Sequence, residues 1–378
     1  AAPPSRLARS AGAMGNGCHT CNACGLDLGS EMSRAMLCGS RAQLTRLLAE
    51  RDLSFQCSGG VNAVAYDGPS RSVVSGDEAG EVRVWDLISG NTRQSMSCTC
   101  PVNAVVCVPE QKAIASGSAD GKVTVWDAAS GECRLEINSG ALPVKAMAYA
   151  PRLKALVVAS GGHGVGNVMA LDPKTGERRL KVLCEEDPLS LSCVEGSTAI
   201  VAGNGKMVTV WTAPGGERLW EVCAGEAPVV GVAHADGLGA VISGDERGSV
   251  VLWEAKTGTR RLGLSCSGGT ILALAYAADL GAVIVAGSGR CVHSYDVVTG
   301  ASLQRLSCGY VARSMQYSEE LQAVVLGHHL EGRRLSALVS PSGRTGMVKV
   351  LPVTAGGQEL HGGPEAPDWA DRASGPLL

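Results

Sequence analysis

The stretch Val82-Arg83-Val84-Trp85-Asp86, followed by Leu-Ile-Ser-Gly90, sets a frame that returns along the chain of 378 residues. Clear copies contain Trp126-Asp127, Trp211-Thr212, Trp253-Glu254 and Tyr295-Asp296, and a weaker copy has Leu171-Asp172. The slots at 85, 126, 171, 211, 253 and 295 are 41, 45, 40, 42 and 42 residues apart. A period this regular indicates stacked structural repeats rather than independent domains.

Each repeat contains the same series of short apolar runs separated by polar or glycine turns. An alternating run such as 102–106 comes first, and a more apolar run ending in Ser-Gly follows, as at Ser116-Gly117. The Trp-Asp run is third, and an outer run such as 261–266 is fourth. Four strands per repeat with a period of 40–45 residues predict an all-β fold, a seven-bladed β-propeller.

The seventh repeat is less regular than the others. Residues 310–313 and 323–327 supply its first two strands, and its third strand is either 335–338 or 347–351. Residues 53–59 resemble the outer strand at 262–268, so an N-terminal strand is available to complete the last blade. We favour 347–351 as the third strand, with 328–345 as an insertion. Closing a ring in this way removes free sheet ends.

These motifs resemble the WD-repeat (WD40) family over about residues 51–353. The resemblance implies a ring that binds other proteins and is completed by an N-terminal strand. The family's Gly-His pair before the first strand is absent from every repeat, and its Asp-Gly turn is well preserved only at Asp120-Gly121. We therefore expect the family's buried His–Asp–Ser–Trp hydrogen-bond network to be missing, and the recurring tryptophans to be core residues.

Composition restricts the classes of partner and compartment. A net charge of −3 argues against a general nucleic-acid or membrane-coating surface, so nucleic acid is an unlikely partner. No apolar run is long enough for a transmembrane segment. The odd number of cysteines, 15, in apolar contexts favours free thiols in a reducing, cytoplasmic compartment. We expect the recurrent cysteines to pack in the core: Cys98, Cys184, Cys223, Cys266 and Cys308.

The segments that flank the repeats differ from them in composition. Residues 1–50 form an N-terminal extension whose first part is rich in Ala, Ser and Arg, which is also typical of an organelle transit peptide. The extension contains a cysteine cluster that could bind zinc, be lipidated or be redox-active, or belong to a disordered tail. The zinc hypothesis uses Cys18, Cys21, Cys24 and Cys38. Residues 354–378, rich in Gly and Pro, are predicted to be a disordered tail.

The candidate partner-binding residues lie in turns on one side of the ring. Turns between second and third strands share that side with the links between blades, and in WD-repeat proteins this side is a common docking face. Acidic residues dominate these turns, and a negative potential would steer a basic partner toward them, unless the acids only keep the loops solvated. Two irregular loops, 160–166 and 328–334, add histidines. The candidates are Asp77, Glu78, Asp120, His163, Asp245, Glu246, Arg247, His328 and His329.

The function we expect is a non-enzymatic scaffold or adaptor within a multiprotein complex, with no cofactor. No Gly-x-Ser-x-Gly elbow or separate pair of carboxylates indicates an active site. Two alternatives stay open: a propeller subunit of a ribonucleoprotein or organelle complex, and a zinc-dependent sensor that uses the N-terminal cysteines.

Overall fold

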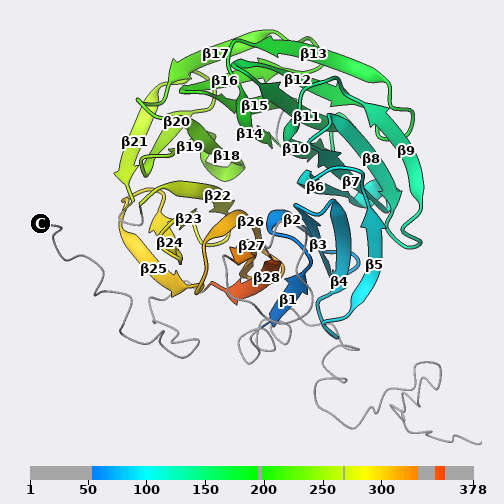
Figure 1. Ribbon diagram of the computed structural model, residues 1–378. Coiled ribbons are helices and arrows are strands. Elements are labelled where there is room, and N and C mark those ends of the chain that lie inside the picture. Colours follow the sequence, from blue (N-terminus) through cyan, green and yellow to red (C-terminus); the bar gives the residue numbers. More distant parts are fainter. Residues whose placement is uncertain (1–52, 195–197, 267–268, 331–344, 354–378) are drawn as a thin grey trace, which may run out of the picture.

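Seven four-stranded antiparallel sheets are arranged as blades around a central axis (Figure 1). The computed structural model describes residues 53–194, 198–266, 269–330 and 345–353. In each blade the first strand lies nearest the axis and the fourth lies at the rim. The predicted fold class, a seven-bladed β-propeller, is confirmed.

The first three blades follow the order of the chain. Blade 1 contains β2 (Val61–Asp67), β3 (Ser72–Asp77), β4 (Glu81–Asp86) and β5 (Thr92–Ser97). Blade 2 contains β6 (Val102–Val108), β7 (Ala113–Ser118), β8 (Lys122–Asp127) and β9 (Cys133–Asn138), with the 3-10 turn η1 (Pro109–Gln111) after β6. Blade 3 contains β10 (Val144–Ala150), β11 (Ala155–Gly162), β12 (Val165–Leu171) and β13 (Arg178–Cys184).

The next three blades repeat this order. Blade 4 contains β14 (Pro188–Cys193), β15 (Ala199–Asn204), β16 (Met207–Thr212) and β17 (Arg218–Cys223). Blade 5 contains β18 (Val229–Ala235), β19 (Ala240–Asp245), β20 (Ser249–Glu254) and β21 (Arg260–Ser265), with the 3-10 turn η2 (Asp236–Leu238) after β18. Blade 6 contains β22 (Ile271–Ala277), β23 (Ala282–Gly287), β24 (Cys291–Asp296) and β25 (Ser302–Ser307).

Blade 7 joins the two ends of the propeller. It contains β26 (Ala312–Ser318), β27 (Ala323–Leu330), β28 (Thr345–Pro352) and, at the rim, β1 (Leu53–Cys57). β1 pairs antiparallel with β28, so that Phe55 lies opposite Val348. The predicted third strand at 347–351 and the N-terminal closing strand are both confirmed. The insertion is shorter than predicted, because β27 continues through His328 and His329.

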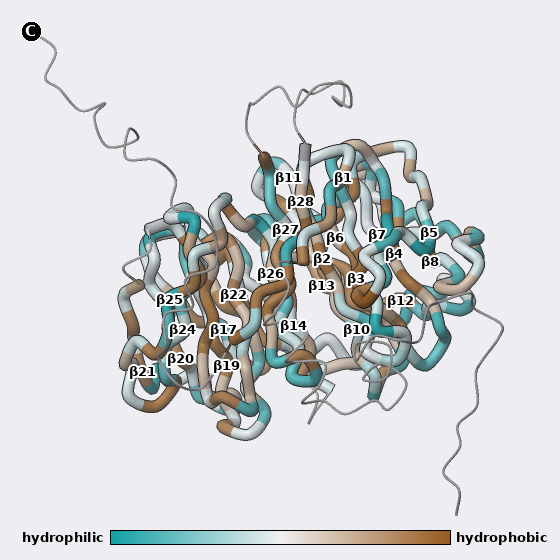
Figure 2. Tube along the Cα trace, turned by 90° about the horizontal axis from the view of Figure 1, so that it is seen from below, coloured by the Kyte–Doolittle hydropathy of each residue, from teal (hydrophilic) through white to brown (hydrophobic). Residues whose placement is uncertain are grey.

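Apolar packing between neighbouring sheets holds the blades together. Every residue of the second strands β3, β7, β19 and β23 is buried, because these strands lie inside their blades. The recurring tryptophans are buried too, as predicted: Trp85, Trp126, Trp211 and Trp253. Figure 2 shows the resulting pattern, with apolar strands inside and hydrophilic turns at the edges.

The hydrogen-bond network that we expected to be missing is partly present. The indole Nε1 of Trp85 donates to Ser75 Oγ at 2.8 Å, and the same bond joins Trp126 to Ser116 and Trp253 to Ser243. The expectation failed because it relied on the absent histidine, whereas the serine at the end of the second strand reaches the indole without it. In blade 1 the Cys57 thiol contacts the same serine, at 3.7 Å.

Two of the recurrent cysteines are not fully buried. Cys223 is exposed, and Cys98 is only partly buried, although it packs against the apolar core between blades 1 and 2 and lies 3.6 Å from Ser116 Oγ. The other three are buried as expected: Cys184, Cys266 and Cys308.

A repeated ion pair fastens the turn between the third and fourth strands. In blade 2 the guanidinium of Arg134 contacts Asp127 and donates to Gln111 O at 2.8 Å. Backbone hydrogen bonds from Ser130, together with this guanidinium, hold the pKa of Asp127 well below its usual range. The equivalent pairs are Arg93–Asp86, Arg179–Asp172 and Arg261–Glu254. Each arginine therefore ties two turns of its own blade together.

Replacement of the closing phenylalanine should open the ring. Phe55 is 3% exposed and stacks on Trp85 with ring centroids 5.3 Å apart. We expect Phe55→Ala to lower the free energy of unfolding by about 3–5 kcal/mol, because it removes a buried ring and leaves a cavity. Thermal unfolding followed by tryptophan fluorescence measures the change. Leu183→Ala, at a position that is 75% exposed, is the control and should change stability by less than about 0.5 kcal/mol. Equal melting temperatures for the two variants would contradict this account of closure.

Candidate interaction surface

The two faces of the ring carry different turns. We call one the linker face: it holds the turns between second and third strands and the links between blades. In blade 1, Glu78 N donates to Gly60 O at 2.9 Å, and Cys98 N donates to Gly80 O at 2.7 Å. Equivalent bonds recur around the ring, so each turn is fixed to the links beside it. The opposite face, which we call the hairpin face, holds the turns between first and second and between third and fourth strands.

Glycine makes this close approach possible. Gly121 has a φ of 81°, and a Cβ there would lie 2.1 Å from Gly140 O. A side chain at this position would therefore push the turn away from the link. The predicted Asp120-Gly121 turn is thus a structural requirement, and the partly exposed Asp120 carboxylate accepts a hydrogen bond from Ser118 Oγ at 2.5 Å within it.

Exposed acidic side chains remain on the linker face after the turns are formed. Glu226 is 83% exposed and pairs with Arg247, which is 67% exposed, at 2.8 Å. Glu246 is exposed, and Glu78 is partly exposed at 23%. The acidic linker face, as we use the term, comprises Glu78, Asp120, Glu185, Glu186, Glu226 and Glu246, and its neighbouring exposed cations are Lys206, Arg247 and Arg290.

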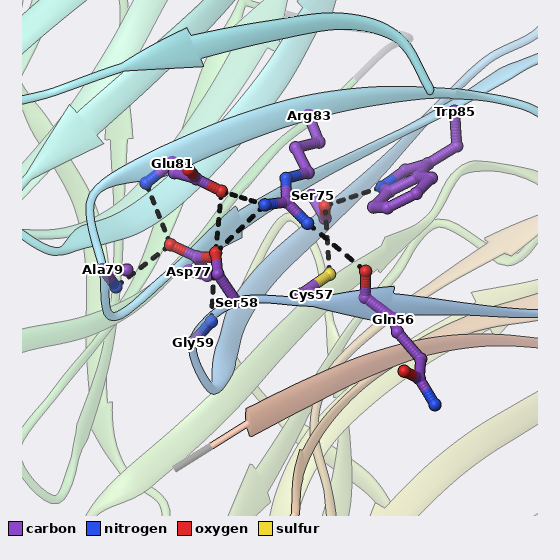
Figure 3. A network of polar contacts seen from close by, with 10 residues as sticks. All are labelled: Gln56, Cys57, Ser58, Gly59, Ser75, Asp77, Ala79, Glu81, Arg83 and Trp85. Atoms are coloured by element: carbon purple, nitrogen blue, oxygen red, sulfur yellow. Dashed lines mark hydrogen bonds and ion pairs between the residues drawn. The ribbon is translucent and has the colours of Figure 1, made fainter. Parts of the chain in front are cut away.

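Asp77, which we predicted as a partner-binding residue, is instead a buried structural group (Figure 3). It is 2% exposed, and its Oδ2 accepts hydrogen bonds from Ser58 Oγ at 3.0 Å and Gly59 N at 3.2 Å. Its Oδ1 accepts from Ala79 N at 3.0 Å and Glu81 N at 2.9 Å. The carboxylate therefore joins the chain that leaves β1 to the turn between β3 and β4.

Asp245 has the same place in blade 5 and is also buried rather than offered to a partner. Its Oδ1 accepts hydrogen bonds from Arg247 N at 3.0 Å and Ser249 N at 2.8 Å. Both aspartates end a second strand, where the pleat turns the carboxylate toward the backbone of the turn.

The two predicted histidines of the seventh repeat are buried in β27. His329 Nε2 lies 3.1 Å from Asn62 Oδ1, and its Nδ1 lies 3.5 Å from Glu78 Oε1, so this ring bridges blades 7 and 1. His328 is fully buried and lies edge-on to Tyr310, with ring centroids 6.1 Å apart. Neither side chain is accessible to a partner, because the strand continues where we expected a loop.

His163 is the one predicted histidine that stands at an exposed turn. The strands β11 and β12 extend to Gly162 and Val165, so the predicted long loop is mostly a longer hairpin. His163 and Gly164 form its tip, both with positive φ, at 59° and 77°.

Comparison with known families agrees with this geometry. The family described as WD domain, G-beta repeat matches residues 51–86 and 90–127, which cover the closing strand, blade 1 and the first three strands of blade 2. The other five blades repeat the same four-strand order. This chain is a WD-repeat propeller. Comparison with curated proteins gives no match.

No metal-binding group is found in the part of this WD-repeat propeller that the structure describes. Groups of three or more His, Cys, Asp or Glu able to hold a metal are absent there. Burial raises the pKa of Cys57 to about 12 and that of Cys308 to about 11, which makes both thiols poor nucleophiles. Among these residues there is also no helix long and apolar enough to cross a membrane. The predicted zinc ligands Cys18, Cys21, Cys24 and Cys38 lie outside the described residues, as does the predicted tail at 354–378.

Removal of the Asp77 carboxylate should cost stability rather than only binding. Asp77→Ala removes the charged acceptor of four hydrogen-bond donors. We therefore expect a loss of about 3 kcal/mol in the free energy of unfolding. Glu246 is an exposed residue of the equivalent turn in blade 5. Glu246→Ala should therefore change the free energy of unfolding by less than about 0.5 kcal/mol. Chemical denaturation of both variants measures the difference. A stable Asp77→Ala protein that lost only partner binding would restore the original prediction.

The stability of this propeller should fall as the pH falls below neutrality. Burial lowers the pKa of His328 from 6.5 to about 4, although the backbone of Val311 favours the protonated ring. Between these values the unfolded chain binds a proton that the folded ring does not. The free energy of unfolding should therefore drop by about 2 kcal/mol from pH 7 to pH 5 through this residue.

Urea denaturation at both pH values measures this drop, and His328→Leu should reduce it by that amount. His163→Leu, which changes an exposed histidine, is the control and should leave the drop unchanged. An identical pH dependence for wild type and His328→Leu would contradict the assignment.

Proposed function

We propose that this WD-repeat propeller is a non-enzymatic scaffold that holds a basic partner protein on its acidic linker face. The observation that supports the proposal is the separation of the acids into two kinds. Asp77 and Asp245 are buried and hold turns, whereas Glu185, Glu226 and Glu246 are exposed on those turns or the adjoining links. Members of the family generally act as protein-interaction scaffolds, which is consistent with this division.

Rigid turns are suited to binding, because little conformational entropy is lost when a partner docks. The turns and links of the linker face are joined by backbone hydrogen bonds around the ring. Exposed carboxylates on such a surface attract a basic patch and accelerate its association at low ionic strength.

We also propose that the protein works in a reducing compartment, of which the cytoplasm is the simplest case. All eleven cysteines in the described part of the chain are free thiols. Cys107 and Cys133, Cys193 and Cys223, and Cys291 and Cys308 share blades, yet none of these pairs is joined as a disulfide framework would require.

Charge reversal on the linker face tests the scaffold proposal. The triple variant Glu185→Lys, Glu226→Lys and Glu246→Lys changes only exposed side chains. We expect it to keep its melting temperature and to lose partners that affinity purification with mass spectrometry recovers with the wild type. Those partners should also dissociate from the wild type as salt is raised, because the contact is electrostatic.

The matched control reverses three exposed acids at the hairpin face, Glu132→Lys, Glu177→Lys and Glu217→Lys. It adds the same charge and should retain the partners. If both triple variants lose the same partners, net charge rather than the linker face is responsible. If neither loses them, the linker face is not the binding site.

A further inference from the structure

The hairpin face has a row of basic residues in an unusual backbone conformation. The turn between first and second strands ends in the left-handed region, where blades 5 and 6 use Gly239 and Gly281, with φ of 56° and 57°. At the equivalent positions blades 1, 2 and 3 instead carry Arg71, Lys112 and Lys154, with φ of 51°, 48° and 48°. Glycine is the residue that this conformation favours, so three successive basic residues there depart from the least strained choice.

Charge is distributed unevenly over this face. Arg152, Lys154 and Lys174 are exposed around the turns of blade 3, and Lys112 is exposed in blade 2. Within the described residues no ion pair engages the Lys112 or Lys154 ammonium groups. The corresponding turns of blades 5 to 7 carry exposed acids and no basic residue (Asp236, Asp279, Glu319 and Glu320), whereas the turn of blade 2 combines Lys112 with the exposed Glu110. The basic arc, as we name Arg71, Lys112, Arg152 and Lys154, is therefore a local feature of a chain with net negative charge.

A cavity of about 350 Å³ lies beside this arc, between blades 1 and 2. Its apolar walls come from Pro69, Pro109 and Ala113 together with Ala128 and Ala129, while Asp67, Ser70, Arg93, Gln94 and Lys112 supply polar groups. The Arg93 guanidinium is held by Asp86, and Ser70 Oγ donates to Asp67. Lys112 is thus the cation of the cavity that is available to a ligand.

Gln94 lines this cavity at a rim position whose residue varies among the blades. The outer strands of blades 2, 3, 4 and 5 carry Leu135, Leu180, Trp220 and Leu262 there, and blade 6 carries Gln304. Trp220 lies against Gly258 of the next blade and donates to Ala255 O at 2.8 Å. Gln94 likewise lies against Gly131 of blade 2 and donates through Nε2 to Ala129 O at 2.5 Å, so its amide forms part of the wall between the two blades.

We propose that the hairpin face of blades 1 to 3 binds an acidic peptide segment of a second partner protein. One apolar side chain of the segment enters the cavity, and its carboxylates pair with Lys112 and Lys154. The volume suits a side-chain-sized group, and the walls are aliphatic. Aromatic platforms for stacking bases are absent among the lining residues, which favours a peptide over RNA.

Selection from a phage-displayed library of random peptides on the full chain supplies the probe. We expect the selected peptides to combine Asp or Glu with one apolar residue, and to bind in fluorescence anisotropy when labelled. Lys112→Glu should weaken binding by about tenfold. Lys112→Gly should weaken it less but leave the melting temperature unchanged or raised, because glycine relieves the left-handed backbone. Ala129→Trp should block the cavity and abolish binding.

Lys206→Glu is the matched control, since it reverses an exposed lysine on the linker face and should leave peptide binding unchanged. Selected peptides without acidic residues, or affinities equal in wild type and Lys112→Glu, would overturn the proposal. Single-stranded oligouridylate and phosphatidylserine vesicles serve as competing anionic probes. If either binds more tightly than the peptides and loses its binding in Lys112→Glu, the arc recognises that class of ligand and the peptide proposal is wrong.

Discussion

Closure of the ring by β1 and β28 is the constraint on which every other contact depends. A propeller blade buries its apolar faces only against its neighbours. A ring of blades that was left open between blades 7 and 1 would therefore expose two sheet faces to water. β1 brings Phe55 onto Trp85 of blade 1 while pairing with β28 of blade 7. Asp77 then fixes the chain that leaves β1, through Ser58 and Gly59. The seam is therefore closed by a strand pairing, a stacked aromatic pair and a buried carboxylate at once.

The same closure determines which polar groups are available for binding. The turns of the linker face are hydrogen-bonded to the links between blades. The carboxylates at the strand ends accept hydrogen bonds from the backbone there and are not available to a partner. In blade 5 the next residue, Glu246, is exposed, whereas Glu78 of blade 1 is 23% exposed and lies 3.5 Å from His329 Nδ1. The acidic linker face and the basic arc lie on opposite sides of one rigid disc, so a partner on one need not displace a partner on the other.

The repeat frame was sufficient to predict the fold, whereas the choice of 347–351 over 335–338 for the last blade also needed the resemblance to WD-repeat rings that are closed by an N-terminal strand. Burial pattern and period are local properties of sequence, and Trp85 and its counterparts display both. Whether an individual acidic residue is buried or exposed could not be predicted in this way. Asp77 and Glu78 are neighbours in one polar turn, yet one is 2% exposed and the other 23%. The carboxylate of Asp77 is buried because it accepts hydrogen bonds from the backbone of its own turn and from Ser58 and Gly59, and closure brings the last two close from outside the repeat. The cavity beside Lys112 was missed for a different reason: its walls come from two adjoining blades, which no single repeat displays.

The order in which the closing strands are made has a consequence for the nascent chain. β1 ends at Cys57, whereas its partner β28 begins at Thr345, 288 residues later. At roughly 5–20 residues per second, a ribosome takes tens of seconds to supply that partner. During this time the strand that contains Phe55 lacks its partner strand, while the ribosome synthesises the blades that follow. Synthesis of this ring thus has an interval during which the first strand has an unpaired edge and is prone to aggregation.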